Sequence, residues 1–396
     1  MKIMMLSWEY PPRNVGGISD HIYYLSHELN KLGHEVHVIT CEEGFAAVDE
    51  DDKGVYVHRV SPFKIDTGDF TKWVMHLNYA MIQEGIKLVT RGGRFDIIHA
   101  HDWLCAYSAK VLKCSFNTPM VCTIHATEHG RNGGIRNEMQ RYISSAEWML
   151  TYEAWKVVAC SNYMRREVNN VFGATWEKIW IIPNGVDEES LQIDFDLVPF
   201  RRQLACDHEK IVFFVGRHVY EKGIHILAEA AKEVTNRSGN VKFVIAGTGP
   251  MTQEIKNWVN RNGIENKFIF TGYVDSETKN KLYRVADAAV FPSIYEPFGI
   301  VALEAMAAKC PVIVSDVGGL GELVEHKKTG LKAYAGSKNS LADNIIEILW
   351  NDKMGNTLSD NAMKVVKEKY SWNRVAGITS DMYKMVKEEA KGTEWC

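Results

Sequence analysis

The sequence lacks the features of several protein classes. Its eight cysteines include no Cys-x-x-Cys pair and no zinc-type spacing, which argues against a disulfide-stabilised or zinc-ribbon protein. No apolar run approaches the length of a membrane span, and the run at the N-terminus is too short for a signal peptide. A net charge of −4 gives no basic footprint for nucleic acid. We therefore expect a reduced, cytoplasmic protein with no transmembrane segment and no nucleic-acid partner; its oligomeric state is not indicated.

The sequence also lacks a complete dinucleotide-binding fingerprint and an Asp-x-Asp metal motif at an expected strand end. Neither WEYPPRNVGGI near the N-terminus nor GTGP at 247–250 completes the G-x-G-x-x-G fingerprint, so a nicotinamide oxidoreductase has no motif in its favour. The only Asp-x-Asp away from a charge run, DFD at 194–196, lies in a polar segment away from any expected strand end. We interpret it as a solvated loop, and VDEDDK at 48–53 as a charged surface turn. The sequence therefore predicts no metal ion and no other cofactor.

What the sequence does contain is a regular alternation of strands and helices. At 396 residues the chain is long enough for two domains. Short, continuously apolar strands alternate with helical patterns such as 18–33, which is typical of parallel sheets covered on both faces. The expected strands fall into two sets, at 2–7, 34–40, 55–60, 96–100, 119–124, 156–160 and 178–183, and at 211–216, 241–247, 268–272, 288–292 and 311–315.

A weakly patterned polar segment, 184–207, separates the two sets and is the expected linker. The sequence thus predicts an α/β protein with one Rossmann-like domain over 1–190 and a second over 191–371. A last helical stretch, from about 372 to 396, is expected to pack back on the first domain.

Open parallel sheets bind ligands at the carboxyl ends of their strands, and unusual residues gather in those loops. Gly16 and Gly17 follow the first strand and precede a helix. Because glycine has no side chain, the backbone there can come close to a ligand, and the exposed N–H groups at the start of the helix attract phosphate. A flexible turn is an equally good interpretation. Arg217 follows a buried strand, and Lys222 precedes a helix. A cation is disfavoured at a helix N-terminus unless an anion binds there, so a diphosphate is a candidate ligand for both side chains.

Two glutamates flank a Pro-Phe-Gly bend in EPFGIVALEA, residues 296–305. Glu304 lies about one turn inside a helix that is otherwise apolar, where an unpartnered carboxylate is rarely buried. Side chains on a helix tilt toward its N-terminus, so Glu304 leans toward the ligand end, and its two oxygens suit a pair of hydroxyl donors such as those of ribose. Glu296 stands at the mouth of the same helix.

Together these residues resemble the sequence motifs of a known enzyme family. E-P-F-G-x-x-x-x-E, with G-R-x-x-x-x-K-G upstream, resembles the retaining GT-B glycosyltransferases of family 4. The resemblance covers nearly the whole chain, through segments 9–21, 99–103, 123–131, 182–187, 246–250 and 315–324. It implies two Rossmann-like domains facing each other across a cleft, with the acceptor on the N-terminal domain and the nucleotide-sugar donor on the C-terminal one.

The resemblance also implies roles on the nucleotide side of the donor. Arg217 and Lys222 would hold the diphosphate and stabilise the leaving nucleotide. Glu304 would bind the ribose. Tyr273 and Val274 would lie along the nucleobase.

Further roles concern the sugar and the acceptor. Glu296 and the backbone at Phe298, Gly299 and Ile300 would contact hydroxyls of the donor sugar, and His125 would lie beside the transferred sugar.

On the opposing domain, Gly17 would cap the phosphates. His101 and Asp102 would lie on the acceptor side, with Asp102 orienting an incoming hydroxyl. The implied substrates are a nucleotide-diphosphate sugar and a carbohydrate acceptor.

The motifs at the N-terminal strand ends look closest to the glycogen and starch synthase-like branch. That implies glucose transfer from ADP- or UDP-glucose to an α-1,4-glucan. A transferase acting on a disaccharide, lipid-linked or cell-surface glycan is the alternative within the fold. A sugar-nucleotide epimerase and a non-catalytic glucan-binding protein are the alternatives outside it.

Overall fold

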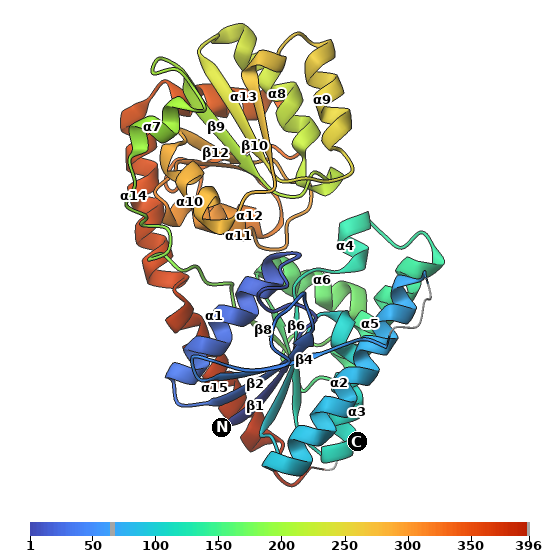
Figure 1. Ribbon diagram of the computed structural model, residues 1–396. Coiled ribbons are helices and arrows are strands. Elements are labelled where there is room, and N and C mark those ends of the chain that lie inside the picture. The colour runs from blue at the N-terminus through green and yellow to red at the C-terminus, as the bar shows by residue number, and fades with distance from the viewer. Residues whose placement is uncertain (64–67, 394–396) are drawn as a thin grey trace. The chain divides into compact units, whose positions relative to one another are not determined.

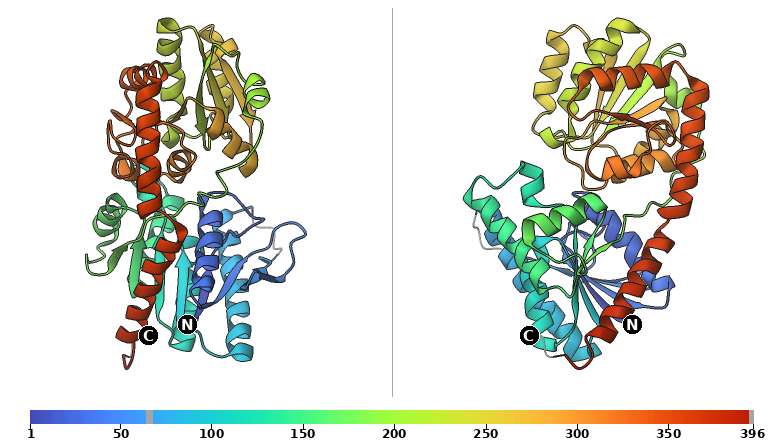
Figure 2. Two further views of the ribbon diagram at one scale, coloured as in Figure 1. Left: turned by 90° about the vertical axis from the view of Figure 1, so that its left-hand side faces the viewer. Right: turned by 180° about the vertical axis from the view of Figure 1, so that it is seen from behind.

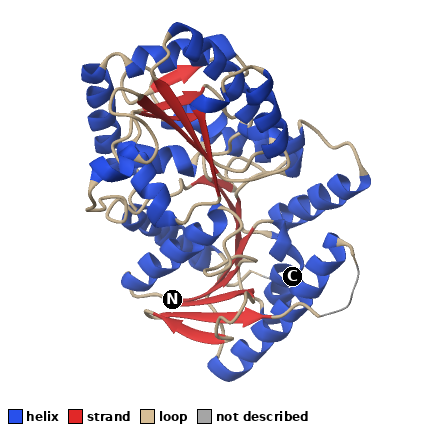
Figure 3. Cartoon of the chain, turned by 45° about the horizontal axis from the view of Figure 1, so that its top comes forward, coloured by secondary structure: helices blue, strands red, loops and turns tan. Residues whose placement is uncertain are grey.

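The computed structural model describes residues 1–63 and 68–393, and the chain forms two compact units. Unit 1 is Met1–Gly185 together with the chain from Trp372 onward, and unit 2 is Val186–Ser371. In each unit a twisted sheet is covered by helices on its two faces (Figure 3). In the described residues no helix combines the length and the apolar character needed to cross a bilayer.

Unit 1 contains an eight-stranded sheet in the order β3-β4-β2-β1-β5-β6-β7-β8. Every neighbouring pair is parallel except β3 and β4. The strands are β1 (Lys2–Leu6), β2 (Glu35–Cys41), β3 (Asp49–Asp52), β4 (Val55–Val60), β5 (Ile97–His101), β6 (Met120–Ile124), β7 (Lys156–Ala159) and β8 (Ile179–Ile181).

The helices of unit 1 cover both faces of this sheet, with α1 and α15 packed together on one side and α2, α3 and α5 on the other (Figure 1). They are α1 (Gly17–Lys31), α2 (Phe70–Gly92), α3 (Ala106–Phe116), α4 (Glu128–Asn132), α5 (Glu138–Glu153), α6 (Asn162–Phe172) and α15 (Trp372–Glu389), with a 3-10 turn, η1, at Trp103–Cys105. Several begin where the side chain of a small polar residue accepts a backbone N–H, as Asp69, Asn137 and Ser161 do.

Unit 2 contains a six-stranded, wholly parallel sheet in the order β11-β10-β9-β12-β13-β14. Its strands are β9 (Lys210–Val215), β10 (Val241–Ala246), β11 (Phe268–Gly272), β12 (Ala288–Phe291), β13 (Val312–Ser315) and β14 (Leu331–Ala333). Its helices are α7 (Leu197–Arg202), α8 (Ile224–Arg237), α9 (Thr252–Arg261), α10 (Ser276–Val285), α11 (Ile300–Ala307), α12 (Gly318–Leu323), α13 (Lys338–Leu349) and α14 (Asp352–Lys369), with 3-10 turns η2 (Tyr220–Lys222) and η3 (Glu265–Lys267).

The last helix, α15, is part of the core of unit 1. Trp372, Val375, Met382 and Tyr383 are buried in the same apolar cluster as residues of β1, β2 and β4. The Tyr383 hydroxyl also lies 2.5 Å from Nδ1 of His99 on β5. Figure 2 shows α15 from two further directions, beside α1. Residues 394–396 of the helix expected from the sequence lie outside the described residues.

Three segments differ from the sequence prediction, and the shortest is strand β14, which the sequence did not predict. Residues 48–53, predicted to be a surface turn, contain strand β3, an exposed edge strand antiparallel to β4. Its acidic side chains are held by neighbours: Glu50 pairs with Arg59 at 2.7 Å, Asp52 accepts from the Tyr10 hydroxyl at 2.8 Å, and Asp49 bonds His58 at 2.8 Å. These partners explain why a run of carboxylates adopts a strand.

The expected linker at 184–207 is also shorter than predicted, because Val186 onward belongs to unit 2. Helix α7 lies in this segment and packs against α10. Arg201 ties it down through bonds to the Val285 carbonyl and the Asp287 carboxylate. The DFD motif is an exposed loop, as expected, and its Asp196 caps α7.

Candidate active site

In unit 2 some of the predicted donor residues lie at the strand ends where the strand order reverses. The chain adds β10 and β11 on one side of β9, and β12, β13 and β14 on the other. The carboxyl ends of β9 and β12 therefore flank a topological switch point, the place where open α/β sheets bind ligands. Arg217 follows β9, and Glu296 lies between β12 and α11.

An ion pair joins two of the predicted residues. Lys222 Nζ lies 2.7 Å from Glu296 Oε2, with 24% of the lysine side chain and 10% of the glutamate side chain exposed. The Ser293 hydroxyl donates to the same oxygen at 3.2 Å. The two loops meet closely because Gly223, at a φ of 68°, follows Lys222, and a Cβ there would lie 1.9 Å from the Pro292 carbonyl oxygen. Only glycine permits both features.

Arg217, by contrast, extends into solvent. Its side chain is 61% exposed, and its contact with Glu221 is a long one of 3.5 Å. The guanidinium is therefore positioned to bind an anion without first giving up a strong partner. Helix α8, which follows Lys222, begins at Gly223 with no side-chain cap, so its N-terminal N–H groups add to the positive potential there.

Glu304 is held on the inner side of α11 by two residues of α10. Its Oε1 pairs with Lys279 Nζ at 2.7 Å, with side-chain exposures of 16% for the lysine and 13% for the glutamate. Its Oε2 lies 3.1 Å from the hydroxyl of Tyr283, whose proton is shared with the Val301 carbonyl. The Glu304 carboxylate is therefore partnered and fixed in orientation. These partners explain why a carboxylate is stable in a helix whose other residues are apolar.

The bend before α11 presents backbone rather than side chains. The Phe298 ring is 5% exposed and contacts Tyr370, with ring centroids 5.9 Å apart. Gly299 has a φ of 102°, and a Cβ there would lie 2.4 Å from Leu320, so glycine is required. Helix α11 starts at Ile300 without a side-chain cap. Tyr273 follows β11 and is 77% exposed.

Val274, next to Tyr273, is partly buried.

Unit 1 has its own switch point, between β1 and β5. Asp102 follows β5 and His125 follows β6. The Asp102 side chain is buried, and its Oδ1 accepts the backbone N–H of His125 at 2.8 Å. Burial raises the pKa of Asp102 to about 6, although Arg131 and backbone N–H groups oppose the shift. The Asp102 carboxylate therefore holds the backbone of the loop that carries His125.

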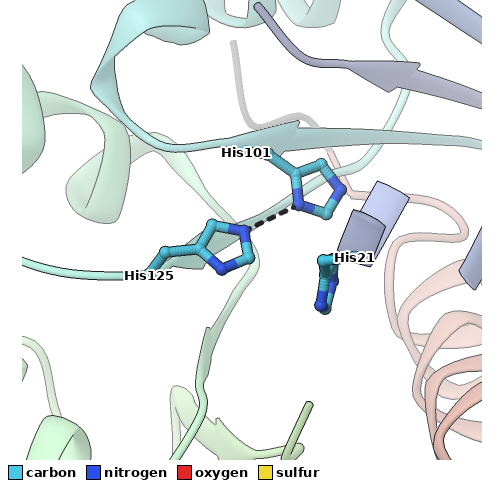
Figure 4. A group of neighbouring side chains, drawn as sticks. All are labelled: His21, His101 and His125. Atoms are coloured by element: carbon cyan, nitrogen blue, oxygen red, sulfur yellow. Dashed lines mark hydrogen bonds between the residues drawn. The ribbon is translucent and has the colours of Figure 1, made fainter. Parts of the chain in front are cut away.

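His125 belongs to a group of histidines at this switch point (Figure 4). His125 Nε2 lies 3.3 Å from Nδ1 of His101, and the His21 ring, from the start of the second turn of α1, contacts both. Burial lowers the pKa of His21 and of His125 to about 3, and lowers that of His101 well below its usual value. All three rings are therefore neutral at pH 7.

The Gly-Gly loop of unit 1 is engaged by a carboxylate of the same chain. Glu9, which is 2% exposed, accepts the N–H groups of Val15 and Gly16 at 2.9 Å each. Burial raises the pKa of Glu9, against these two bonds and the charge of Arg13. The Gly16 amide is therefore not a free donor, and a phosphate contact through it requires Glu9 to move. Gly17 begins α1.

Sequence reasoning missed Glu9, His21, Lys279 and Tyr283. Glu9 was detectable, because a carboxylate between Trp8 and Tyr10 poses the same question as Glu304 in its apolar helix. Lys279 and Tyr283 carry no such signal, since they meet Glu304 only through the packing of α10 on α11.

Comparison with known proteins agrees with this architecture. Residues 15–190 match the family described as Glycosyltransferase Family 4, and residues 199–365 match Glycosyl transferases group 1. An uncharacterized glycosyltransferase of Methanocaldococcus jannaschii is 39% identical over 98% of this chain and 99% of its own length. The glycogen synthase of Mycobacterium tuberculosis is 33% identical over 97% of this chain and 94% of its own.

Among solved structures, the sucrose-phosphate synthase of Thermosynechococcus elongatus has a TM-score of 0.84. It is 23% identical and covers 98% of this chain and 99% of its own, a likeness that shows the fold. The two parallel-sheet units are therefore the two Rossmann-like domains of the GT-B fold. The chain belongs to the family 4 glycosyltransferases, in the branch that resembles glycogen and starch synthases.

Proposed function

We propose that this glycosyltransferase moves a glucosyl group from ADP- or UDP-glucose to an α-1,4-glucan, with retention of anomeric configuration and without a metal ion. The glucan is favoured by the similarity to a glycogen synthase along nearly the whole chain. Unit 2 binds the donor, and unit 1 supplies groups that act on the acceptor and on the transferred sugar.

The observation that carries this proposal is the Lys222–Glu296 pair at the switch point of unit 2, with Arg217 exposed beside the same strand ends. A donor of this class has an anionic diphosphate next to a sugar rich in hydroxyl groups. Two cations suit the diphosphate, and a carboxylate suits the hydroxyls. Glu304, fixed by Lys279 and Tyr283, is proposed to bind the ribose.

The chemistry assigned to these residues is electrostatic. The bond between the anomeric carbon and the diphosphate oxygen breaks, and a bond forms from the same carbon to the acceptor oxygen. The acceptor hydroxyl loses its proton to the departing phosphate on the same face of the sugar. Negative charge grows on the diphosphate as the bond breaks, so cations already placed there lower the barrier.

Unit 1 contributes an uncharged hydrogen-bonding group. Because the pKa of His125 is lowered to about 3 by burial, its imidazole is uncharged at pH 7 and serves as a hydrogen-bond partner for a sugar hydroxyl. Asp102 holds the His125 backbone and so fixes where that imidazole stands.

A two-stage experiment tests the proposal. Thermal unfolding of the protein is first measured with ADP-, UDP- and GDP-sugars to find the donor, and the donor is then supplied with maltooligosaccharides. We expect products longer by one glucose in an α linkage, and loss of this activity in Glu296→Gln. Transfer only to disaccharide or lipid-linked acceptors would replace the glucan with the alternative acceptor class. A donor that binds but is neither transferred nor hydrolysed would overturn the enzymatic proposal.

A further inference from the structure

The histidines at the switch point of unit 1 have a geometry that the proposed reaction does not require. One ring nitrogen from each of His21, His101 and His125 lies within 4.8 Å of the corresponding nitrogens of the other two. The three side chains come from separate elements, α1, β5 and the loop after β6, and converge on one point (Figure 4). His21 and His101 are buried, and His125 is partly buried.

Two ring nitrogens of this group are buried without a hydrogen-bond partner. His21 Nδ1 lies 2.7 Å from Oδ1 of Asn184, and since an amide oxygen only accepts, Nδ1 carries the proton. The neutral His21 ring therefore has its lone pair on Nε2, which is buried and has no hydrogen-bond partner. His101 Nε2 is also buried and unpartnered, and it carries the ring proton when Nδ1 supplies the lone pair. Buried polar atoms without partners are rare in folded proteins and call for an explanation.

One pair of nitrogens already has the spacing of two ligands in a metal centre. Two ligands that are each about 2.0–2.1 Å from a tetrahedral zinc ion lie about 3.3 Å apart. His101 Nδ1 and His125 Nε2 are already 3.3 Å apart, and one ring nitrogen of His21 lies within 4.8 Å of a nitrogen of each. An ion bound here would take the place of the proton that His101 and His125 share. The bond from His21 Nδ1–H to Asn184 is the outer-shell contact that orients metal-binding histidines.

We propose that His21, His101 and His125 form a binding site for a divalent transition metal of the zinc type, with a fourth position open to water. Neutral imidazole suits zinc, cobalt and nickel, and three protein nitrogens with one open position is a known zinc geometry. The metal is not a catalyst for the reaction proposed above.

The ion is instead an inhibitor. Metal binding would occupy the nitrogen of His125, the residue that the proposed function assigns to the transferred sugar. Zinc should therefore slow transfer, and a chelator should reverse the effect. This consequence depends on the proposed function, whereas metal binding itself does not.

Binding is tested on the full chain without an affinity tag, stripped with chelator and free of substrates. We expect one equivalent of Co²⁺ to give the visible absorption of four-coordinate cobalt, and Zn²⁺ to displace it. X-ray absorption on the wild-type zinc complex should show three imidazole ligands. This measurement needs no variant, so it stands even if a substitution impairs folding. Sulfur ligands would point to Cys114 or Cys206, the exposed cysteines of the described chain, and would overturn the assignment.

A pair of variants locates the site. His21→Gln should weaken metal binding by at least about 10- to 100-fold. His58→Ala is the matched control, because His58 belongs to the other group of potential ligands, with Asp49 and Glu84. It should bind one equivalent like the wild type. Unchanged binding in His21→Gln, or lost binding in His58→Ala, would refute the proposal.

The inhibition is then measured with each protein normalised to its own rate in chelator. Zinc inhibition should be present in the wild type and weakened in His21→Gln. Metal binding with no transfer activity in any assay would leave the metal site standing and reject the proposed function. Transfer activity without metal binding would support the proposed function and reject the metal site.

Discussion

The two glutamates of EPFGIVALEA should divide their work between nucleotide and sugar, and substitution by glutamine separates the two. Glu304→Gln keeps the shape of the side chain but replaces a charged acceptor with a neutral amide. Loss of a hydrogen bond to a charged group costs about 1.5–3 kcal/mol. If the ribose hydroxyls bind Glu304, the affinity for free nucleoside diphosphate should fall by about 10- to 150-fold. Isothermal calorimetry measures this directly.

The structure also sets the stability cost of the same change. Glutamine replaces the carboxylate that Lys279 Nζ contacts at 2.7 Å with a neutral amide, and the lysine side chain is only 16% exposed. A cost of about 1.5–3 kcal/mol in unit 2 corresponds to a fall in Tm of about 3–12 °C for a unit of this size. Lys279→Met is the matched control, because it breaks the same ion pair and leaves the carboxylate in place. It should lower Tm similarly and keep the nucleotide affinity within about threefold of wild type, a change below 1 kcal/mol.

Glu296→Gln should behave differently. Free nucleoside diphosphate contains the ribose but no sugar at the far phosphate, so its affinity should stay near wild type in this variant. The kcat for transfer should fall more than KM rises, because contacts to the reacting sugar change between ground and transition state. Nucleotide affinity lost in Glu296→Gln and retained in Glu304→Gln would show that the two roles have been assigned the wrong way round.

Three further results are expected. Arg217→Ala should lower kcat by about a hundredfold, because it removes a cation from the leaving diphosphate. Its Tm should change by less than about 2 °C, because the Arg217 side chain is 61% exposed. A higher KM with wild-type kcat would instead show that Arg217 binds the ground state and the transition state equally. Transfer should persist in excess chelator, and activity that disappears with chelator and returns with manganese would refute the metal-free mechanism. Burial raises the pKa of Glu147 from 4.5 to about 8, so the folded state keeps a proton that the unfolded state releases. Stability should therefore fall as the pH rises from about 4.5 to 8, and Glu147→Gln, studied by urea unfolding at several pH values, should flatten that slope.

The sequence predicted the parallel sheets well because their strands are short, continuously apolar and separated by loops rich in glycine. It missed the β3 strand for the opposite reason. DEDD has no strand propensity, and its pairing with β4 depends on Arg59, His58 and Tyr10, which are distant in sequence or on another strand. Strand β14, with three residues, is too short to give a pattern.

The residues of the candidate site also fall into those that the sequence could predict and those that it could not. Residues at strand ends, such as Arg217 and Glu296, were predictable because topology alone brings them to one edge of the sheet. Partners that meet through side-chain packing were not, as with Lys279 on Glu304 or Glu9 on Gly16. One sequence shows which side chains are unusual for their surroundings, but it does not show which other element neutralises them.

The way the chain passes between its units has a consequence for how the protein folds. Unit 2 starts at Val186 and ends at Ser371, and these two residues form a bridge pair, with the Val186 N–H bonded to the Tyr370 carbonyl. Unit 2 is thus an insertion whose two ends are adjacent, so it can fold as a closed piece while still attached at both sides.

Unit 1 cannot be completed in the same order. Its core contains Trp372, Met382 and Tyr383 of α15, which leave the ribosome only after the whole of unit 2. Until α15 has been synthesised, the apolar face that it covers on the first 185 residues therefore remains exposed. The inserted unit, although second in sequence, is the one able to finish folding first during synthesis.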